Sequence, residues 1–128
     1  MHPLQHIIVG LLLGIIILPT TGVYLSGVFF IGSIFPDTDH IISYAINTGS
    51  INPLEAYRYY TSEHVRPTYI LHTYEAMITL ILLSIYTRSK TIRVFTLGFL
   101  FHMLTDIGQE YFAHEVMMKP GLLLNLIL

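Results

Sequence analysis

Long apolar segments separated by short polar ones dominate the sequence. Residues 7–36 contain no aspartate, glutamate, lysine or arginine. Pro19 and Gly22 divide this run, and the apolar segments on either side cover residues 4–18 and 23–35. Each segment is shorter than the ~20 residues of a full transmembrane helix, and proline and glycine commonly mark turns. We therefore expect two short helices that are tilted or partly re-entrant.

The remaining sequence predicts a polar excursion followed by two further helices. Residues 36–67 are rich in polar and turn-forming residues and contain one short amphipathic helix near residues 54–60. Apolar residues return in helices expected at residues 68–86 and 94–107, with a basic turn between them. A last apolar stretch covers residues 122–128. The chain thus alternates between apolar helices and polar connections.

Composition favours a membrane protein. Of the 128 residues, 53% are hydrophobic and 11% are charged, whereas soluble domains contain about 25% charged residues. No lysine or arginine precedes Arg58, so the N-terminal segment lacks the basic region of a secretory signal and we expect it in the mature protein. The sequence predicts one all-α domain over residues 1–128, an integral membrane bundle of about four to five helices.

Charge and cysteine content exclude several classes of function. The six lysines and arginines are scattered and the net charge is −2, so no basic stripe is available for nucleic acid. The absence of cysteine excludes disulfides, thiolate nucleophiles and cysteine-ligated metals. The seven histidines outnumber the lysines and arginines, although polar groups are costly to bury in such a chain. Any metal site must therefore use histidine and carboxylate ligands.

His102 and Asp106 are the sharpest candidates for chemistry, because they interrupt the apolar helix expected at residues 94–107. Residues four apart lie on one face of a helix and can bind the same cation. A hydrogen-bonded pair that joins two helices is the alternative. Ionisable residues within an apolar helix are functional candidates by default, so we assign both as metal ligands.

Three further positions supply candidate ligands. The sequence Pro-Asp-Thr-Asp-His places Asp37 and Asp39 directly after the second apolar segment. Either carboxylate could bridge two metals, although a turn and helix cap would use the same residues. His6 stands near the start of the first helix, and His72 lies three residues before Glu75. Interfacial anchoring or helix capping are the alternatives for these two histidines.

Helices that alternate in direction would collect all the candidates at one end of the bundle. The N-terminus, the polar excursion and the end of the helix at residues 94–107 then share one side. The basic turn with Arg88, Lys90 and Arg93 lies on the opposite side. Because basic loops favour the cytoplasm, we expect a protein of the cell's inner membrane whose polar site faces the extracytoplasmic side.

The order of these features resembles a known family, the YdjM-like membrane-bound metal-dependent hydrolases. The resemblance covers nearly the whole chain, and one stretch departs from it: between His64 and His72 the sequence is longer than the family's His-Arg-Gly-x-Thr-His and lacks its glycine. The features that carry the resemblance are His6 followed by Gly10, Pro-Asp-Thr-Asp-His at residues 36–40, Arg66 and His72 at the third helix, and His102-x-x-x-Asp106 in the fourth.

The resemblance implies an all-helical fold related to zinc-dependent phospholipase C and P1 nuclease. It also implies a set of metal ligands, which are His6, Asp37 or Asp39, His72, His102 and Asp106. Arg66 is a candidate for holding a phosphate group. The family is one of hydrolases, and the metals of the related fold are bound by histidine and aspartate.

The leading hypothesis is a membrane-bound hydrolase that contains one or two divalent ions. Imidazole and carboxylate ligands suit Zn²⁺ first, with Mn²⁺ or Fe²⁺ as alternatives, and such ions activate water for attack on a phosphoester. Asp37 and Asp39 are the candidate catalytic carboxylates, and the substrate would be a lipid-linked or headgroup phosphate. The competing hypothesis is a non-catalytic multi-pass membrane protein that keeps the cluster as a structural or metal-binding element. The oligomeric state stays open.

Overall fold

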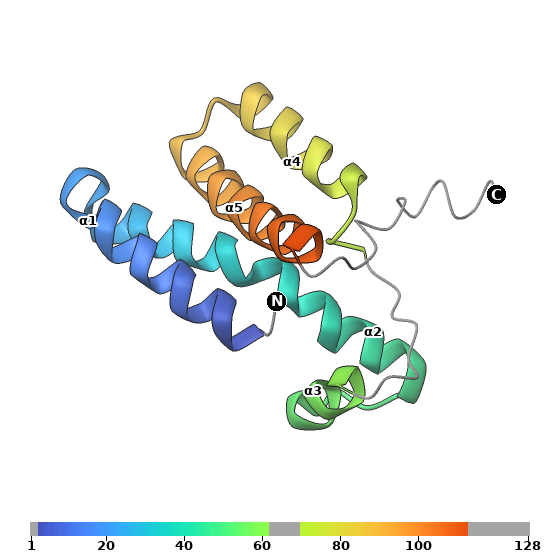
Figure 1. Ribbon diagram of the computed structural model, residues 1–128. Helices are drawn as coiled ribbons and strands as arrows, with labels where there is room; N and C mark the ends of the chain where they lie inside the picture. Colours follow the sequence, from blue (N-terminus) through green and yellow to red (C-terminus); the bar gives the residue numbers. More distant parts are fainter. Residues whose placement is uncertain (1–2, 62–69, 113–128) are drawn as a thin grey trace.

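The computed structural model describes residues 3–61 and 70–112, and this part of the chain is all-α, without strands (Figure 1). The predicted all-α class is confirmed, whereas Arg66 and the apolar stretch at residues 122–128 lie outside the described residues. The elements are α1 (Pro3–Ile34), the 3-10 helix η1 (Phe35–Asp37), α2 (Thr38–Thr48), α3 (Pro53–Thr61), α4 (Tyr74–Thr87) and α5 (Lys90–Phe112).

Helix α1 is a helical hairpin, because its backbone reverses at Gly22 (Figure 1). Gly22 has φ 77° and ψ 166°, a combination that only glycine adopts without steric strain. The first arm, residues 3–21, includes Pro19 within the helix, and the second arm covers residues 23–34. The predicted division of the apolar run is confirmed, with Gly22 and not Pro19 as the point of reversal.

Helix α5 lies between α4 and the α1 hairpin (Figure 1). Glycines on both sides permit a very close contact between α5 and the second arm of α1. A Cβ atom at Gly98 would overlap the backbone oxygen of Phe29, and one at Gly32 would overlap the backbone oxygen of Phe95. The two backbones therefore touch without an intervening side chain, as small residues allow in tightly packed helix pairs.

Helices α2 and α3 form a pair that extends away from the α4–α5–α1 layers (Figure 1). Helix α2 ends at Thr48 and is capped by Gly49, which has a left-handed backbone conformation. The pair is joined by the Tyr44 hydroxyl, which donates a hydrogen bond of 2.8 Å to Glu55, and by the buried side chain of Ala56. The polar excursion predicted at residues 36–67 is therefore largely helical where it is described.

The start of the helix predicted at residues 68–86 is wrong. Helix α4 begins at Tyr74, because Thr73 has an extended backbone and its hydroxyl accepts a hydrogen bond from the backbone N–H of Ala76. Threonine is a favoured N-cap residue for this reason. His72 consequently lies in the turn before the helix.

The bounds of the helix predicted at residues 94–107 are also too narrow. Helix α5 begins at Lys90 and continues through Gly108 to Phe112. A single glycine costs a helix only about 1 kcal/mol, which the contacts of α5 with its neighbours can offset. Both His102 and Asp106 lie within this helix, as predicted.

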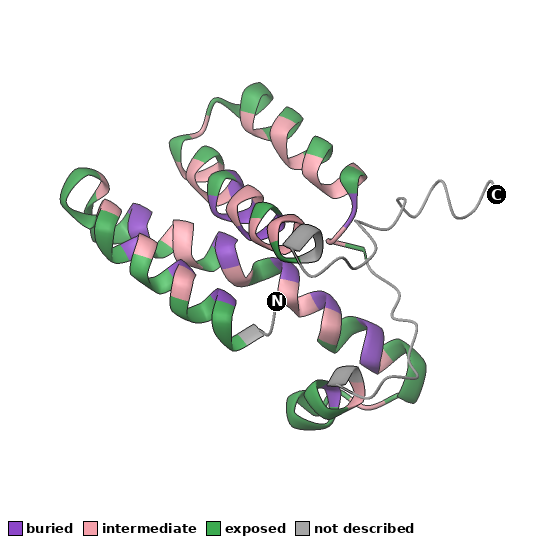
Figure 2. Ribbon diagram, viewed as in Figure 1, coloured by how far each residue is buried: buried purple, intermediate pink, exposed green. Residues whose placement is uncertain are grey.

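Much of the hairpin is exposed (Figure 2). Many of its exposed residues are apolar, whereas several buried residues are polar. Leu12, Ile16 and Val23 are 55%, 68% and 79% exposed. Exposed apolar surface of this extent marks contact with a partner or a membrane. The buried polar residues are His6, Ser26, Ser33, Asp39, Ser43, Thr73, Thr96 and His102.

One helical stretch in the described residues, Leu4–Thr48, is long and apolar enough to cross a membrane. The core helix of a soluble protein or a signal sequence can satisfy the same criterion. This stretch includes the reversal at Gly22, so it consists of two shorter arms and does not form one straight helix. At 1.5 Å per residue the first arm is about 28 Å long, close to the ~30 Å thickness of the hydrocarbon core.

Replacing Gly98 with alanine should destabilise the contact between α1 and α5. The added Cβ would overlap the backbone of Phe29, and overpacking of this kind typically costs about 1–3 kcal/mol. Gly27→Ala is the matched control, because nothing lies within 4 Å of its Cβ position. Thermal unfolding in detergent should show a lower midpoint for Gly98→Ala and an unchanged or slightly higher midpoint for Gly27→Ala. Equal midpoints would contradict the close contact.

Candidate metal centre

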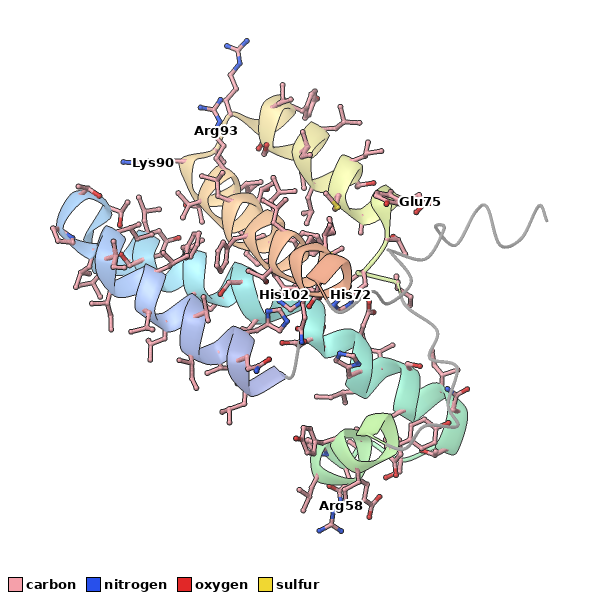
Figure 3. The ribbon with its side chains drawn as sticks, in the orientation of Figure 1. Arg58, His72, Glu75, Lys90, Arg93 and His102 are labelled. Atoms are coloured by element: carbon pink, nitrogen blue, oxygen red, sulfur yellow. The ribbon has the colours of Figure 1, made fainter. Side chains whose placement is uncertain are left out.

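Five of the six candidate ligands predicted from the sequence meet at one end of the contact between α1 and α5. His6 lies at the start of the first arm of α1, Asp37 in η1 and His72 just before α4, while His102 and Asp106 lie in α5. Figure 3 shows the labelled His72 and His102 next to each other at this end. The predicted convergence of these residues is confirmed, although they come from four separate parts of the chain.

Three ligand atoms of the centre form a triangle that suits one metal ion. His72 Nε2 lies 3.1 Å from His102 Nε2 and 3.4 Å from Asp106 Oδ2. The distance between His102 Nε2 and Asp106 Oδ2 is 3.2 Å. Ligands bound at 2.0–2.1 Å to one tetrahedral ion are separated by roughly 3.3 Å. The three atoms therefore match one face of a ligand tetrahedron, and we call them the ligand triangle.

Hydrogen bonds fix the direction of two imidazole rings in the ligand triangle. His102 Nδ1 lies 2.7 Å from the backbone oxygen of Ser33, which can only accept, so Nδ1 must donate. His72 Nδ1 lies 3.2 Å from Asp39 Oδ2, which is an acceptor when ionised. In neutral rings both Nε2 lone pairs then face each other. This arrangement is repulsive unless a proton or a cation lies between them.

His6 contacts the other carboxylate oxygen of Asp106. Its ring stacks on His102, with centroids 3.8 Å apart, and its Nε2 lies 2.9 Å from Asp106 Oδ1. His6 Nδ1 is 3.3 Å from the hydroxyl of Thr105, whose proton is donated to the backbone oxygen of His102. The carboxylate oxygen of Asp106 accepts, so His6 Nε2 is the donor in the contact with Asp106. Asp106 consequently offers one oxygen to His6 and the other to the ligand triangle.

Asp37 connects the ligand triangle with two further groups of potential ligands. The groups His6–Asp37–His102 and Asp37–His40–His72 each present ligand atoms within 4.8 Å of one another. Asp37 Oδ1 lies 3.9 Å from His102 Nε2, and its Oδ2 is buried without a hydrogen-bond partner among the described residues. An unsatisfied buried oxygen is costly. Asp37 is therefore placed where a bridging carboxylate would be.

Asp39 occupies a different position, although the sequence made it equivalent to Asp37. Its side chain is fully buried and belongs to none of the three groups of potential ligands found in residues 3–61 and 70–112. Asp39 Oδ2 accepts hydrogen bonds from the backbone N–H groups of Ile70, Leu71 and His72. The structure thus brings Asp37, and not Asp39, to the other ligand atoms.

His40 is a potential ligand that the sequence-based assignment left out. Its Nε2 lies 3.7 Å from Asp37 Oδ1, and its ring centroid lies 5.7 Å from that of His72. The available signal was its position three residues after Asp37, which places the two on one face of a helix. The sequence placed His40 next to Asp37 and Asp39 but gave no reason to assign it as a ligand.

The charge of the site depends on His72. Burial alone would lower the pKa of His72, but the hydrogen bonds that its ring donates to Asp106 and Asp39, and the negative charges of these two residues, outweigh it and raise the pKa to about 9. At neutral pH the metal-free centre therefore holds a proton on His72. A metal ion must displace this proton, so metal binding releases a proton and weakens as the pH falls.

The basic turn lies far from the metal centre, as predicted from the sequence. Figure 3 shows Lys90 and Arg93 at the opposite end of α5 from His102, and Arg58 on α3, pointing away from the centre. Among the described residues, the side chains that gather at the centre are imidazoles and carboxylates. Arg66, the candidate for holding a phosphate, lies outside the described residues.

Comparison with models of protein families, with curated proteins and with solved structures finds no match to this chain. The YdjM-like resemblance stays an expectation drawn from the motifs.

Metal content should depend on the ligand triangle. Purified protein incubated with Zn²⁺ and desalted should retain at least one equivalent, measured by elemental mass spectrometry. His102→Ala and Asp106→Asn should lose it, because each removes one of three ligand atoms. Glu55→Gln is the matched control, since Glu55 binds Tyr44 on the α2–α3 pair. Equal zinc content in all four proteins would contradict the assignment.

Proposed function

We propose that this protein is a membrane-bound metal-dependent hydrolase that cleaves a phosphoester. The observation that carries the proposal is the ligand triangle, in which three protein ligand atoms from His72, His102 and Asp106 lie close to one another. Structural zinc is usually bound by four protein ligands, whereas catalytic zinc has three and keeps a position for water. The bound ion would activate that water for attack on the phosphoester.

The donor set favours Zn²⁺, with Mn²⁺ or Fe²⁺ as alternatives. Imidazole nitrogens and carboxylate oxygens without thiolate suit these ions. His72, His102 and Asp106 would hold the first ion. Asp37, with His6 or His40, would hold a second ion and bridge the two. Two ions a few ångströms apart would suit displacement at phosphorus.

Asp37 is also the carboxylate best placed to accept a proton from the attacking water. Its Oδ2 has no hydrogen-bond partner among the described residues, so it is available for a new one. Asp106 is less suited, because both of its oxygens already face imidazole nitrogens. Of the two catalytic candidates from the sequence, Asp37 and Asp39, we assign this role to Asp37.

A membrane location is supported by the exposed apolar surface of the hairpin and of α4. Ile16 and Val23 are mostly exposed, as are Leu82 and Ile85 on α4. In a bilayer these residues would contact lipid, and the polar interior would be held together by hydrogen bonds between helices. We propose insertion in the cell's inner membrane, with the metal centre on the extracytoplasmic side and the basic turn in the cytoplasm.

This placement would put the metal centre at the end of an apolar hairpin, where the phosphates of lipids lie. The substrate class we propose is therefore a lipid-linked or headgroup phosphoester. The motif resemblance to the YdjM-like hydrolases, and through them to the phospholipase C and P1 nuclease fold, points to the same chemistry. A shared fold does not by itself establish a shared activity, and the support for hydrolysis comes from the metal centre.

Removing the Asp37 carboxylate should abolish hydrolysis. With Zn²⁺ present, the native protein should hydrolyse bis(p-nitrophenyl) phosphate or phosphatidic acid in mixed micelles. Asp37→Asn should lower kcat at least ~100-fold, because general base catalysis contributes about 10²–10⁴-fold. Glu55→Gln should retain full activity, and EDTA should abolish activity until Zn²⁺ is restored.

A native protein that binds zinc tightly but hydrolyses neither substrate would favour the competing hypothesis. The cluster would then be a structural or metal-binding element of a non-catalytic multi-pass protein. Activity that survives both EDTA and Asp37→Asn would contradict the proposed chemistry.

The absence of native cysteine allows a direct test of membrane orientation. Single cysteines are placed at Ile16 in the hairpin, at Lys90 in the basic turn and at Asn47 in α2. In sealed vesicles, a membrane-impermeant maleimide should label Lys90→Cys from the cytoplasmic side and Asn47→Cys from the other. Ile16→Cys should stay unlabelled. Rapid labelling of Ile16→Cys would contradict the membrane proposal, and labelling of Asn47→Cys and Lys90→Cys from one side would contradict the topology.

A further inference from the structure

We propose that Asp39 is a positioning residue, a buried latch that holds the turn at residues 70–72 against α2 and aims His72 Nε2 into the ligand triangle. This inference rests on the proposed function, because it takes His72 to be a metal ligand. It assigns to Asp39 a role other than metal binding or proton transfer.

The latch consists of one carboxylate oxygen that accepts four hydrogen bonds. Asp39 Oδ2 lies 3.1 Å from the backbone nitrogen of Ile70 and 3.0 Å from that of His72, and it also accepts from Leu71. The fourth donor is His72 Nδ1 at 3.2 Å. Successive N–H groups that converge on one oxygen form an anion-binding concavity. This oxygen is therefore saturated by the turn.

The turn needs this partner because its amides precede α4 and have no acceptor within that helix. Helix α4 begins only at Tyr74. The carboxylate of Asp39 is fully buried, and charged acceptors form the stronger hydrogen bonds to backbone N–H groups. Removing the carboxylate would leave the three backbone N–H groups and His72 Nδ1 without their acceptor, which is unfavourable for groups that stay buried.

The same oxygen selects the tautomer of His72. Because Asp39 Oδ2 accepts from Nδ1, the neutral, metal-binding form of His72 has its lone pair on Nε2, which lies 3.1 Å from His102 Nε2 and 3.4 Å from Asp106 Oδ2. Carboxylates that bind the outer nitrogen of a ligating histidine orient the ring and raise its basicity, and their loss typically weakens metal affinity 10–100-fold. Ser33 provides the equivalent acceptor for His102.

Hydrogen exchange in the metal-free full-length protein tests the latch without reference to metal. Exchange is followed by mass spectrometry in peptides that cover residues 70–72. Asp39→Ala should speed exchange of these amides at least ~10-fold while the amides of α5 keep their protection, which shows that the fold persists. Glu75→Gln is the matched control, because it removes a carboxylate three residues after His72 that lies outside all three ligand groups. Unchanged exchange in Asp39→Ala would overturn the latch.

Zinc titration against a competing chelator tests the positioning of His72. Asp39→Asn keeps the size of the side chain and one acceptor oxygen. It should weaken Zn²⁺ binding about 10–100-fold with unchanged stoichiometry. Loss of a whole equivalent of zinc in Asp39→Asn would overturn the inference, because it would make Asp39 a direct ligand. Unchanged affinity in both Asp39 variants would equally overturn it.

The two parts of the experiment separate this inference from the proposed function. If the native protein binds no zinc, the hydrolase proposal and the positioning role fail together. Slower exchange in the native protein than in Asp39→Ala would then still assign the latch itself to Asp39. If the native protein binds zinc and the exchange rates are equal, the proposed function survives and the latch does not.

Discussion

The close contact between α5 and the second arm of α1 is the constraint on which the metal centre depends. The two backbones can meet only because Gly32 and Gly98 have a hydrogen atom in place of a side chain. One turn beyond Gly98, His102 Nδ1 then reaches the backbone oxygen of Ser33 at 2.7 Å. A Cβ at Gly10 would overlap the Ser33 hydroxyl, so the first arm, which carries His6, packs against the same point. A larger residue at these positions would separate the helices and remove the acceptor that orients His102.

Hydrogen-bond acceptors outside the centre orient two imidazole rings so that their inner nitrogens face the ligand triangle. Ser33 binds the outer nitrogen of His102, and Asp39 binds that of His72. The inner nitrogens then converge on Asp106 at distances of 3.2 and 3.4 Å. Two nitrogen lone pairs and a negative carboxylate at these distances repel one another unless a cation lies between them. A proton on His72 or a metal ion provides this positive charge. The surrounding helices thus hold the ligand atoms at the separations that a metal requires.

Sequence patterns predicted the features that depend on composition and short spacing. The apolar run with its break predicted the hairpin, and the four-residue spacing of His102 and Asp106 predicted one pair of ligands on one helix face. The different positions of Asp37 and Asp39 could not be predicted, because Asp39 binds backbone groups of a turn some thirty residues away. His40 was missed for the same reason, since its proximity to the other ligands depends on how η1 directs α2. Long-range backbone contacts of this kind leave no periodic signal in the chain.

The central claim is that the ligand triangle binds a metal ion with a position left for water. X-ray absorption at the zinc edge of the zinc-loaded protein tests it most directly, because it counts ligands and identifies imidazole by its outer-shell scattering. The account predicts nitrogen and oxygen ligands at about 2.0–2.1 Å, at least two of them imidazoles, and one imidazole fewer in His102→Ala if that variant retains metal. A spectrum without imidazole scattering, or one identical in His102→Ala, would contradict the account.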